Sequence, residues 1–376
     1  MLSALPKTTS DYQVISTVRI FAICSVVWGH CAIGTHIAAF QNGYSLGLQS
    51  FATQLGKMGT ILFFIISGFL VSHKLATYTV LGFLQHRFKT TILPWMIFVV
   101  LLVSIIIIND KQLTSILLEG NQSEISTMAY RVFSSVIFYH TYWFVLVFII
   151  SMVILILFKH YILSPKMGLV LALFTLYYTV NLHFGWTSIH HTRAFLGYIL
   201  FAWVGIYICK HYLVFTTWVN QKRWKILLPI LAIAVAVACI EGDELTRIGC
   251  NDPYASIRLS NIFVTLVLFL CLFKAGRARF INRLIPDQIV YGIYLVHNIL
   301  LYEQTILIKT YLHHSLVNHS TLFLLSMQLI NFFFIMFTSI VIVKAFFNRK
   351  PIAAQLIKIL TVNKSTRTKI AYTDNL

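Results

Sequence analysis

Long, uninterrupted apolar runs dominate this sequence, and segments of that kind fold stably as membrane-spanning helices. A transmembrane helix needs ~20 mostly apolar residues, and ten candidate spans of about that scale can be recognised. Of the 376 residues only 11% are charged, against about 25% in soluble domains. An outer-membrane barrel would show ~10-residue alternating segments instead. The sequence therefore predicts an all-α polytopic membrane protein. The predicted spans are 14–38, 56–73, 91–109, 134–158, 167–183, 194–210, 225–241, 258–274, 288–307 and 321–345.

Charge is distributed unevenly between alternate loops, which predicts the orientation of the helices. With the N-terminus inside, the outer segments keep seven of the 29 Lys and Arg residues and eight of the 11 acidic ones. Cytoplasmic loops carry the excess of Lys and Arg, so both termini are expected in the cytoplasm, with about ten helices between them. We expect one membrane domain over 1–345 and a basic cytoplasmic tail over 346–376 that lies against anionic lipid.

The net charge of +18 does not indicate nucleic acid, because the basic residues follow membrane topology and form no groove-reading surface. The start of the chain is polar and lacks the features of a cleaved signal, so the first helix is expected to be retained. The six cysteines are scattered without a C-x-x-C pair, and no metal site is indicated. Membrane lipids are the partners that composition predicts.

The first span carries two ionisable residues, Arg19 and His30. On a helix they fall within ~20° of one face and ~16 Å apart. If Arg19 reaches the inner headgroups, His30 is expected near mid-bilayer, where a polar side chain is costly and predicts a function. The structural alternative is a histidine satisfied by a neighbouring helix.

The second span and the loop after it offer residues for a phosphorylated cofactor. Ser67 and Gly68 lie in F-F-I-I-S-G-F-L, where small residues either pack two helices closely or leave room beside His30 for a narrow acyl chain. Arg87 and Lys89 precede the third span. They are either topological anchors or groups that grip phosphate.

Aromatic and polar residues gather in segments that are predicted to lie outside. His140 and Trp143 belong to F-Y-H-T-Y-W-F, and His190 and Arg193 belong to W-T-S-I-H-H-T-R. Such residues suit a sugar, whose apolar face stacks while its hydroxyls hydrogen-bond, and they also suit interfacial anchoring.

The ninth span contains Tyr294 and His297, three residues apart and therefore on adjacent parts of one face. His297 is a second intramembrane histidine beside that of the first span. Carboxylates are absent from the middle of the spans, which weighs against ion-coupled transport and leaves histidine as the group with a pKa suited to general-base work.

Five motifs in order across residues 19–297 resemble the acyltransferase-3 family, whose members modify cell-surface glycans. They are R-x10-H, F-F-x-x-S-G-F-L, a basic loop ending in L-P, an aromatic Tyr-Trp-Phe opening and Y-G-I-Y-L-V-H. The middle segment reads Y-W-F-V-L-V-F without the glutamate of many members, which is closer to the exopolysaccharide and enterobacterial-common-antigen O-acetyltransferases. The basic loop has Thr90 where the family often has a second arginine.

The resemblance implies an O-acetyltransferase of the bacterial inner membrane that moves an acetyl group from cytoplasmic acetyl-CoA to a sugar hydroxyl of a surface or lipid-linked glycan. His30 matches the essential histidine of the family and Arg19 its partner arginine. The histidine either takes the hydroxyl proton or carries the acetyl group. Two other hypotheses remain: a flippase for a lipid-linked saccharide, and a non-catalytic membrane subunit of a polysaccharide synthase.

Overall fold

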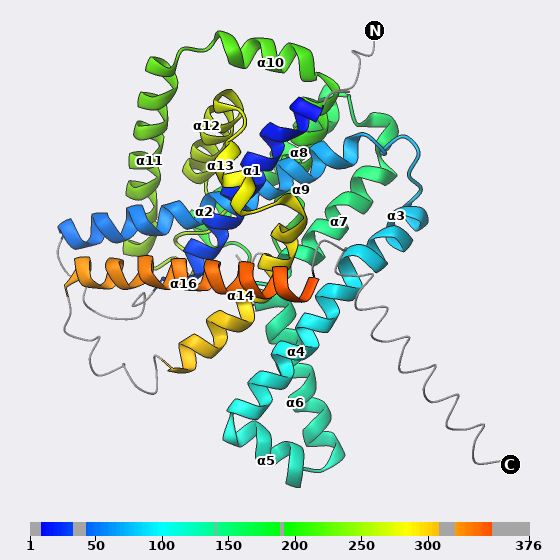
Figure 1. The fold of residues 1–376 in the computed structure, drawn as a ribbon, viewed down its shortest axis with the longest axis vertical. Coiled ribbons are helices and arrows are strands. Elements are labelled where there is room, and N and C mark those ends of the chain that lie inside the picture. Colours follow the sequence, from blue (N-terminus) through cyan, green and yellow to red (C-terminus); the bar gives the residue numbers. More distant parts are fainter. Residues whose placement is uncertain (1–8, 33–42, 140, 189–191, 308–319, 348–376) are drawn as a thin grey trace, which may run out of the picture.

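The protein is built of helices, and no strand occurs among the residues that the computed structural model describes, 9–32, 43–139, 141–188, 192–307 and 320–347 (Figure 1). The predicted all-α fold is confirmed. The helices are α1 (Thr9–His30), α2 (Gly43–Ser72), α3 (Val80–Arg87), η1 (Phe88–Ile92), α4 (Leu93–Asn109), α5 (Lys111–Glu119), α6 (Gln122–Ser134), η2 (Ser135–Tyr139), α7 (Trp143–Leu157), η3 (Lys159–Tyr161), α8 (Pro165–Phe184), α9 (Phe195–Lys210), α10 (Tyr212–Gln221), α11 (Trp224–Arg247), α12 (Leu259–Ala275), α13 (Arg279–Leu284), α14 (Asp287–Leu307) and α16 (Thr321–Phe347).

Five of these helices are long and apolar enough to cross a membrane, and two strongly bent helix pairs would raise the number to seven within the described part of the chain. Large apolar side chains are exposed along them, for example Phe333, Phe334 and Phe337 of α16. Extensive exposed apolar surface marks a contact with lipid or protein, and here it belongs to a multi-pass membrane protein. The five are Gly47–Ser72, Val80–Asn109, Pro165–Phe184, Trp224–Arg247 and Thr321–Phe346.

Each of the ten predicted spans overlaps a helix of the structure. The number of helices that cross the bilayer and the cytoplasmic placement of the termini stay predictions. One boundary differs clearly, because the first helix ends at His30 and the predicted span ended at residue 38. The predicted tail lies outside the described residues except for its first two.

Helix α2 packs against α1, α9, α11 and α12 in the interior of the protein. Glycines make its two closest crossings possible. A Cβ on Gly56 would stand 2.3 Å from the Cα of Gly29 in α1, and one on Gly68 would stand 1.8 Å from the carbonyl oxygen of Ala202 in α9. Small residues let membrane helices approach to backbone contact, so these glycines allow α1 and α9 to pack closely on α2.

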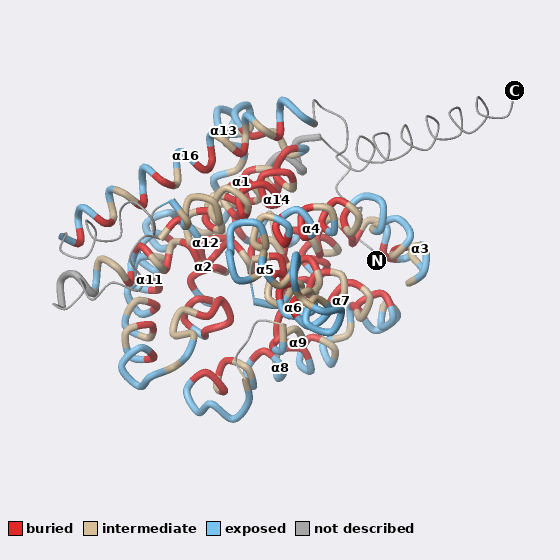
Figure 2. The backbone as a smooth tube through the Cα atoms, turned by 90° about the horizontal axis from the view of Figure 1, so that it is seen from below, coloured by how far each residue is buried: buried red, intermediate tan, exposed pale blue. Residues whose placement is uncertain are grey.

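Most buried hydrophobic residues belong to two large clusters, one around α2 and α9 and one around α1, α4, α14 and α16. In Figure 2 the buried colour concentrates where α1, α2, α12 and α14 meet, whereas α5 is mostly exposed. The hairpin of α5 and α6 projects from one end of the molecule (Figure 1). The polar residues of α1 and α14 described next lie on helices that contribute to the second cluster.

Candidate active site

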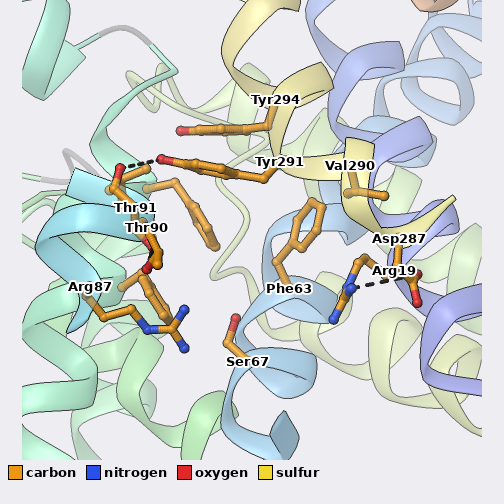
Figure 3. Close-up of a pocket in the computed structure, with 13 residues that line it drawn as sticks. Arg19, Phe63, Ser67, Arg87, Thr90, Thr91, Asp287, Val290, Tyr291 and Tyr294 are labelled. Carbon is orange, nitrogen blue, oxygen red and sulfur yellow. Dashed lines mark hydrogen bonds and ion pairs between the residues drawn. The ribbon is translucent and has the colours of Figure 1, made fainter. Parts of the chain in front are cut away.

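A cavity of about 270 Å³ opens between α1, α2, η1, α7 and α14. Its wall combines two arginines and one carboxylate with hydroxyl groups and aromatic rings, so polar and apolar parts of one ligand could be held together. Figure 3 shows Arg87 on one side of this space and Arg19 with Asp287 on the other, with Ser67 between them. The lining residues are Arg19, Phe63, Ser67, Arg87, Thr90, Thr91, Phe144, Val145, Phe148, Asp287, Val290, Tyr291 and Tyr294.

Arg19 is held on its side of the cavity by the first residue of α14. Its guanidinium Nη1 lies 3.6 Å from Oδ1 of Asp287. The hydroxyl of Ser16, one helical turn before Arg19, donates a hydrogen bond to the other carboxylate oxygen. Two residues of α1 therefore converge on one carboxylate of α14.

Arg87 reaches the cavity from the opposite wall, at the point where α3 passes into a π-helical turn over Phe88–Ile92. Its guanidinium lies over the rings of Phe83 and Phe148, at 5.6 and 5.7 Å from their centroids. Its Nε is buried without a hydrogen-bond partner in the described residues. This arrangement holds a cation at the cavity with hydrogen-bonding capacity left for an anion.

The π-helical turn also brings Thr90 and Thr91 to the cavity. Pro94 follows at the start of α4, and proline has no N–H to bond the carbonyl four residues back. A π-helical turn is one way for a helix to accommodate the hydrogen bond that proline cannot donate, and π-turns are frequent at functional sites. The proline thus explains why this stretch of the chain departs from a regular α-helix.

Two tyrosines of α14 form the remaining wall. The hydroxyl of Tyr291 donates to the carbonyl of Thr91 at 2.7 Å, and that of Tyr294 donates to the carbonyl of Thr141 at 2.7 Å. Their rings lie at 13° to each other and are seen nearly parallel in Figure 3. Since both hydroxyls are tied to the backbone, the rings have fixed positions in the wall.

Tyr294 connects this cavity to a pair of histidines. Its ring centroid lies 5.8 Å from that of His297, which in turn lies 5.9 Å from that of His30. His297 is fully buried, and its Nδ1 is 3.1 Å from the carbonyl oxygen of Ile293. A carbonyl only accepts hydrogen bonds, so Nδ1 carries the proton and Nε2 keeps a lone pair. That Nε2 has no hydrogen-bond partner among the described residues.

His30 ends α1 and is exposed, and side chains of α16 hold the backbone around it. Gln328 donates to the carbonyl of Trp28 at 3.2 Å, and Asn331 donates to the carbonyl of Cys31 at 3.2 Å. The last carbonyls of a helix have no partner within the helix. The two amides donate to carbonyls at this end of the helix and attach the end of α1 to α16.

These features form an elongated site along α1, with two arginines at one end and two histidines at the other. The arginine end suits an anionic group, and the histidine end offers a base. The family model for the acyltransferase domain of the acyltransferase-3 family matches residues 13–347. The chain belongs to this family. No curated protein and no solved structure matches the sequence significantly.

The protein is therefore a membrane acyltransferase. Of the residues predicted to serve the site, Arg19, Ser67, Arg87 and Tyr294 line the cavity. His30 and His297 lie beyond Tyr294, as the contacts between their rings show.

Other predicted residues of the acyltransferase lie away from the cavity. Gly68 packs against Ala202 of α9, because consecutive helical residues point ~100° apart and Ser67 takes the cavity side. Trp143 is buried with its ring centroid 5.3 Å from that of Tyr198, and Lys89 and Arg193 are exposed. His140 and His190 lie outside the described residues.

The site of this acyltransferase includes residues that the sequence did not single out, namely Asp287, Thr91, Gln328 and Asn331, and Thr90, which the sequence marked only as a departure from the family pattern, lines the cavity. Asp287 had a recognisable signal, since most acidic residues fall in segments predicted to lie outside while it precedes the ninth span on the inner side. Gln328 and Asn331 are polar residues of an apolar helix, which is costly in a membrane unless they find partners.

Proposed function

We propose that this acyltransferase moves an acetyl group from cytoplasmic acetyl-CoA to a sugar hydroxyl of a cell-surface or lipid-linked glycan, in a bacterial inner membrane. The observation that carries the proposal is the succession along α1 and α14 of a cavity flanked by Arg19 and Arg87, the ring of Tyr294, and the pair of His30 and His297.

The arginine end has the chemistry to hold the phosphates of the donor. Arg19 and Arg87 face each other across the cavity (Figure 3), and arginine binds phosphate through charge-assisted hydrogen bonds. Thr90 and Ser67 add hydroxyl groups. The cavity volume of about 270 Å³ lies just under the ~300–1,000 Å³ of small-molecule sites, so it takes part of the donor, and the acyl arm extends toward the histidines.

The distance between the arginine end and the histidine end suits a donor whose phosphates bind at one end and whose thioester reacts at the other. Arg19 and His30 are separated by ~16 Å of helix at 1.5 Å per residue. The negatively charged part of the donor and its reacting thioester are distant from each other along an extended arm. A site that holds both therefore needs its cations and its base well apart, as they are here.

His30 would act on the hydroxyl or on the acyl group. As a general base, its ring nitrogen takes the proton of the sugar hydroxyl while that oxygen attacks the thioester carbonyl. The carbon–sulfur bond then breaks, and the proton passes to the leaving thiolate. In a two-step route the imidazole nitrogen first attacks the thioester carbonyl and the carbon–sulfur bond breaks, so that CoA leaves as the thiol; the sugar oxygen then attacks the acetyl carbon, and the released imidazole takes the hydroxyl proton.

The test compares acetyl transfer in membranes that hold equal amounts of wild type or His30→Ala, with radiolabelled acetyl-CoA as donor and glycan-bearing membranes as acceptor. We expect transfer to fall by ~10²–10⁴-fold, the usual contribution of a general acid or base. Arg247→Ala is the control, because this exposed arginine pairs with Glu244 one turn before it on α11 and does not line the cavity.

Undiminished transfer by His30→Ala would contradict the site assignment. Glycan movement across the membrane without any dependence on an acyl donor would contradict the proposed activity and favour a flippase. Mass spectrometry of surface glycans from cells with and without the protein identifies the transferred group.

A further inference from the structure

Helices α1 and α14 contact each other through two pairs of polar residues. At one end Arg19 of α1 meets Asp287 of α14 at 3.6 Å, and at the other the rings of His30 and His297 lie 5.9 Å apart. Eleven residues separate the members on α1 and ten separate those on α14. Since both pairs advance in the same direction along the chain, the two helices run side by side and parallel.

The two contacts approach α1 from different flanks of α14. At ~100° per residue, Arg19 and His30 lie within ~20° of one face of α1, but Asp287 and His297 are ~80° apart around α14. A rotation or a sliding movement of α1 against α14 would therefore break at least one of the contacts. Together the two pairs define both the rotation and the axial register of α1.

Asp287 is the group through which the first contact is made. It receives the hydroxyl of Ser16 in addition to the guanidinium of Arg19. It also begins α14, where the helix dipole favours a negative charge. A single carboxylate thus connects two successive turns of α1 to the first turn of α14.

A carboxylate is an unfavourable neighbour for an anionic donor. It lines the same cavity as Arg19 and Arg87 and would repel a phosphate group there. Binding of the donor alone would be stronger without it. Its presence at this position is explained better by the geometry it imposes on α1 than by any contact with the donor.

We propose that Asp287 is a positioning residue of the acyltransferase: by holding Ser16 and Arg19, it sets the rotation and register of α1 so that His30 faces His297. This inference rests on the proposed function, in which His30 acts on the acyl group. In this proposal, a residue at the first turn of α14 determines where His30 lies at the other end of α1.

The activity test uses Asp287→Asn, which keeps the shape of the side chain and removes its charge. A misplacement of ~1 Å can cost ~10²-fold in rate, and we expect kcat to fall at least tenfold. The KM for acetyl-CoA should stay equal or decrease, because a repelling carboxylate has been removed. Asp287→Glu keeps the charge and should recover part of kcat.

Glu303→Gln is the matched control, because it makes the same change near the other end of α14, where the carboxylate accepts a hydrogen bond from Asn109. Its kcat and KM should equal those of wild type. A kcat of Asp287→Asn equal to wild type overturns the proposal. An increased KM with unchanged kcat also overturns it, since Asp287 would then serve donor binding.

A second measurement does not depend on activity. Diethyl pyrocarbonate modifies imidazole nitrogens, and mass spectrometry of the peptide with His30 gives its rate in purified, monodisperse protein. We expect that rate to change about twofold or more in Asp287→Asn and not in Glu303→Gln, because its ring no longer lies against His297 in the same way. Unchanged labelling overturns the proposal whatever the activity is.

The kinetic and labelling experiments together distinguish failure of the proposed function from failure of the proposed role of Asp287. If wild-type membranes transfer no acetyl group, the proposed function fails and the labelling alone decides the role of Asp287. If Asp287→Asn does not accumulate as folded protein, Ser16→Ala removes one of the two α1 groups that hold the carboxylate. The same kinetic and labelling outcomes then apply to it, with a smaller expected fall in kcat of about threefold.

Discussion

Two regions of the protein surround an arginine with polar groups, and they differ in what fills the space beside it. Arg87 lines a cavity, and its buried Nε, like that of Arg258, has no hydrogen-bond partner in the described residues. Arg258 is completely buried between α2, α11 and α12. Its Nη1 donates to the carbonyl of Ala238 at 2.9 Å and its Nη2 donates to the amide oxygen of Gln54 at 2.6 Å.

Protein groups thus accept hydrogen bonds from both terminal nitrogens of the Arg258 guanidinium. The ring of Tyr254 lies 4.8 Å from its guanidinium carbon, and Gln54 passes the network on to Asn261 through a hydrogen bond of 2.7 Å. A buried charge is costly unless such partners compensate it. The comparison shows that a buried arginine indicates a ligand site when its guanidinium lines a cavity, as that of Arg87 does, and not when it is enclosed by protein groups, as that of Arg258 is.

The largest effect is expected from Arg87→Ala. Hydrogen bonds to charged groups contribute about 1.5–3 kcal/mol, so the KM for acetyl-CoA should increase about 10–100-fold. Steady-state kinetics with labelled donor measures it. Arg87→Lys keeps the charge without the planar fork and should lie between alanine and wild type. If Arg87→Ala left the KM for acetyl-CoA unchanged, Arg87 would be a structural residue like Arg258.

Arg258→Leu should affect stability and leave catalysis unchanged. The substitution removes the donors to Ala238 and Gln54, and each buried acceptor left without a partner costs about 1–3 kcal/mol. We expect a thermal unfolding midpoint several degrees lower in detergent. The KM and kcat per folded molecule should stay within about twofold of wild type. A strongly increased KM for acetyl-CoA would instead reveal a ligand beside Arg258.

The smallest effect is expected from Lys89→Ala. This lysine lies on the same turn of chain as Arg87 but is exposed and does not line the cavity. Exposed charges are screened by salt and contribute little, so the KM for acetyl-CoA should change less than about twofold at physiological ionic strength. A tenfold increase would show that the donor extends beyond the cavity over this surface.

Part of the site could be read from the sequence because its pattern is local. Arg19 and His30 share a helix face by their spacing alone, and the structure places them at the two ends of the site. Tyr294 and His297 are likewise three residues apart in one helix, and their rings are in contact. Residues related by helical spacing need no knowledge of the neighbouring helices.

Helical periodicity did not predict which face of a helix lines the cavity, as two neighbouring residues of α2 show. Ser67 lines the cavity, whereas Gly68 meets the carbonyl of Ala202 in α9. Periodicity places them ~100° apart but does not say which side of α2 faces the cavity. Trp143 was expected at a sugar-binding mouth and instead packs on Tyr198, since an aromatic residue suits a core and a binding surface equally well.

The sequence by itself determined that this protein is a helical membrane protein, where its apolar segments lie and that it belongs to the acyltransferase-3 family, because hydropathy and motif order are properties of the chain. Only the tertiary structure decided that Asp287 meets Arg19 and that Asn331 holds the end of α1 beside His30. Those contacts join segments hundreds of residues apart. They depend on which helices pack together and on the rotation of each, which the period of a single helix does not specify.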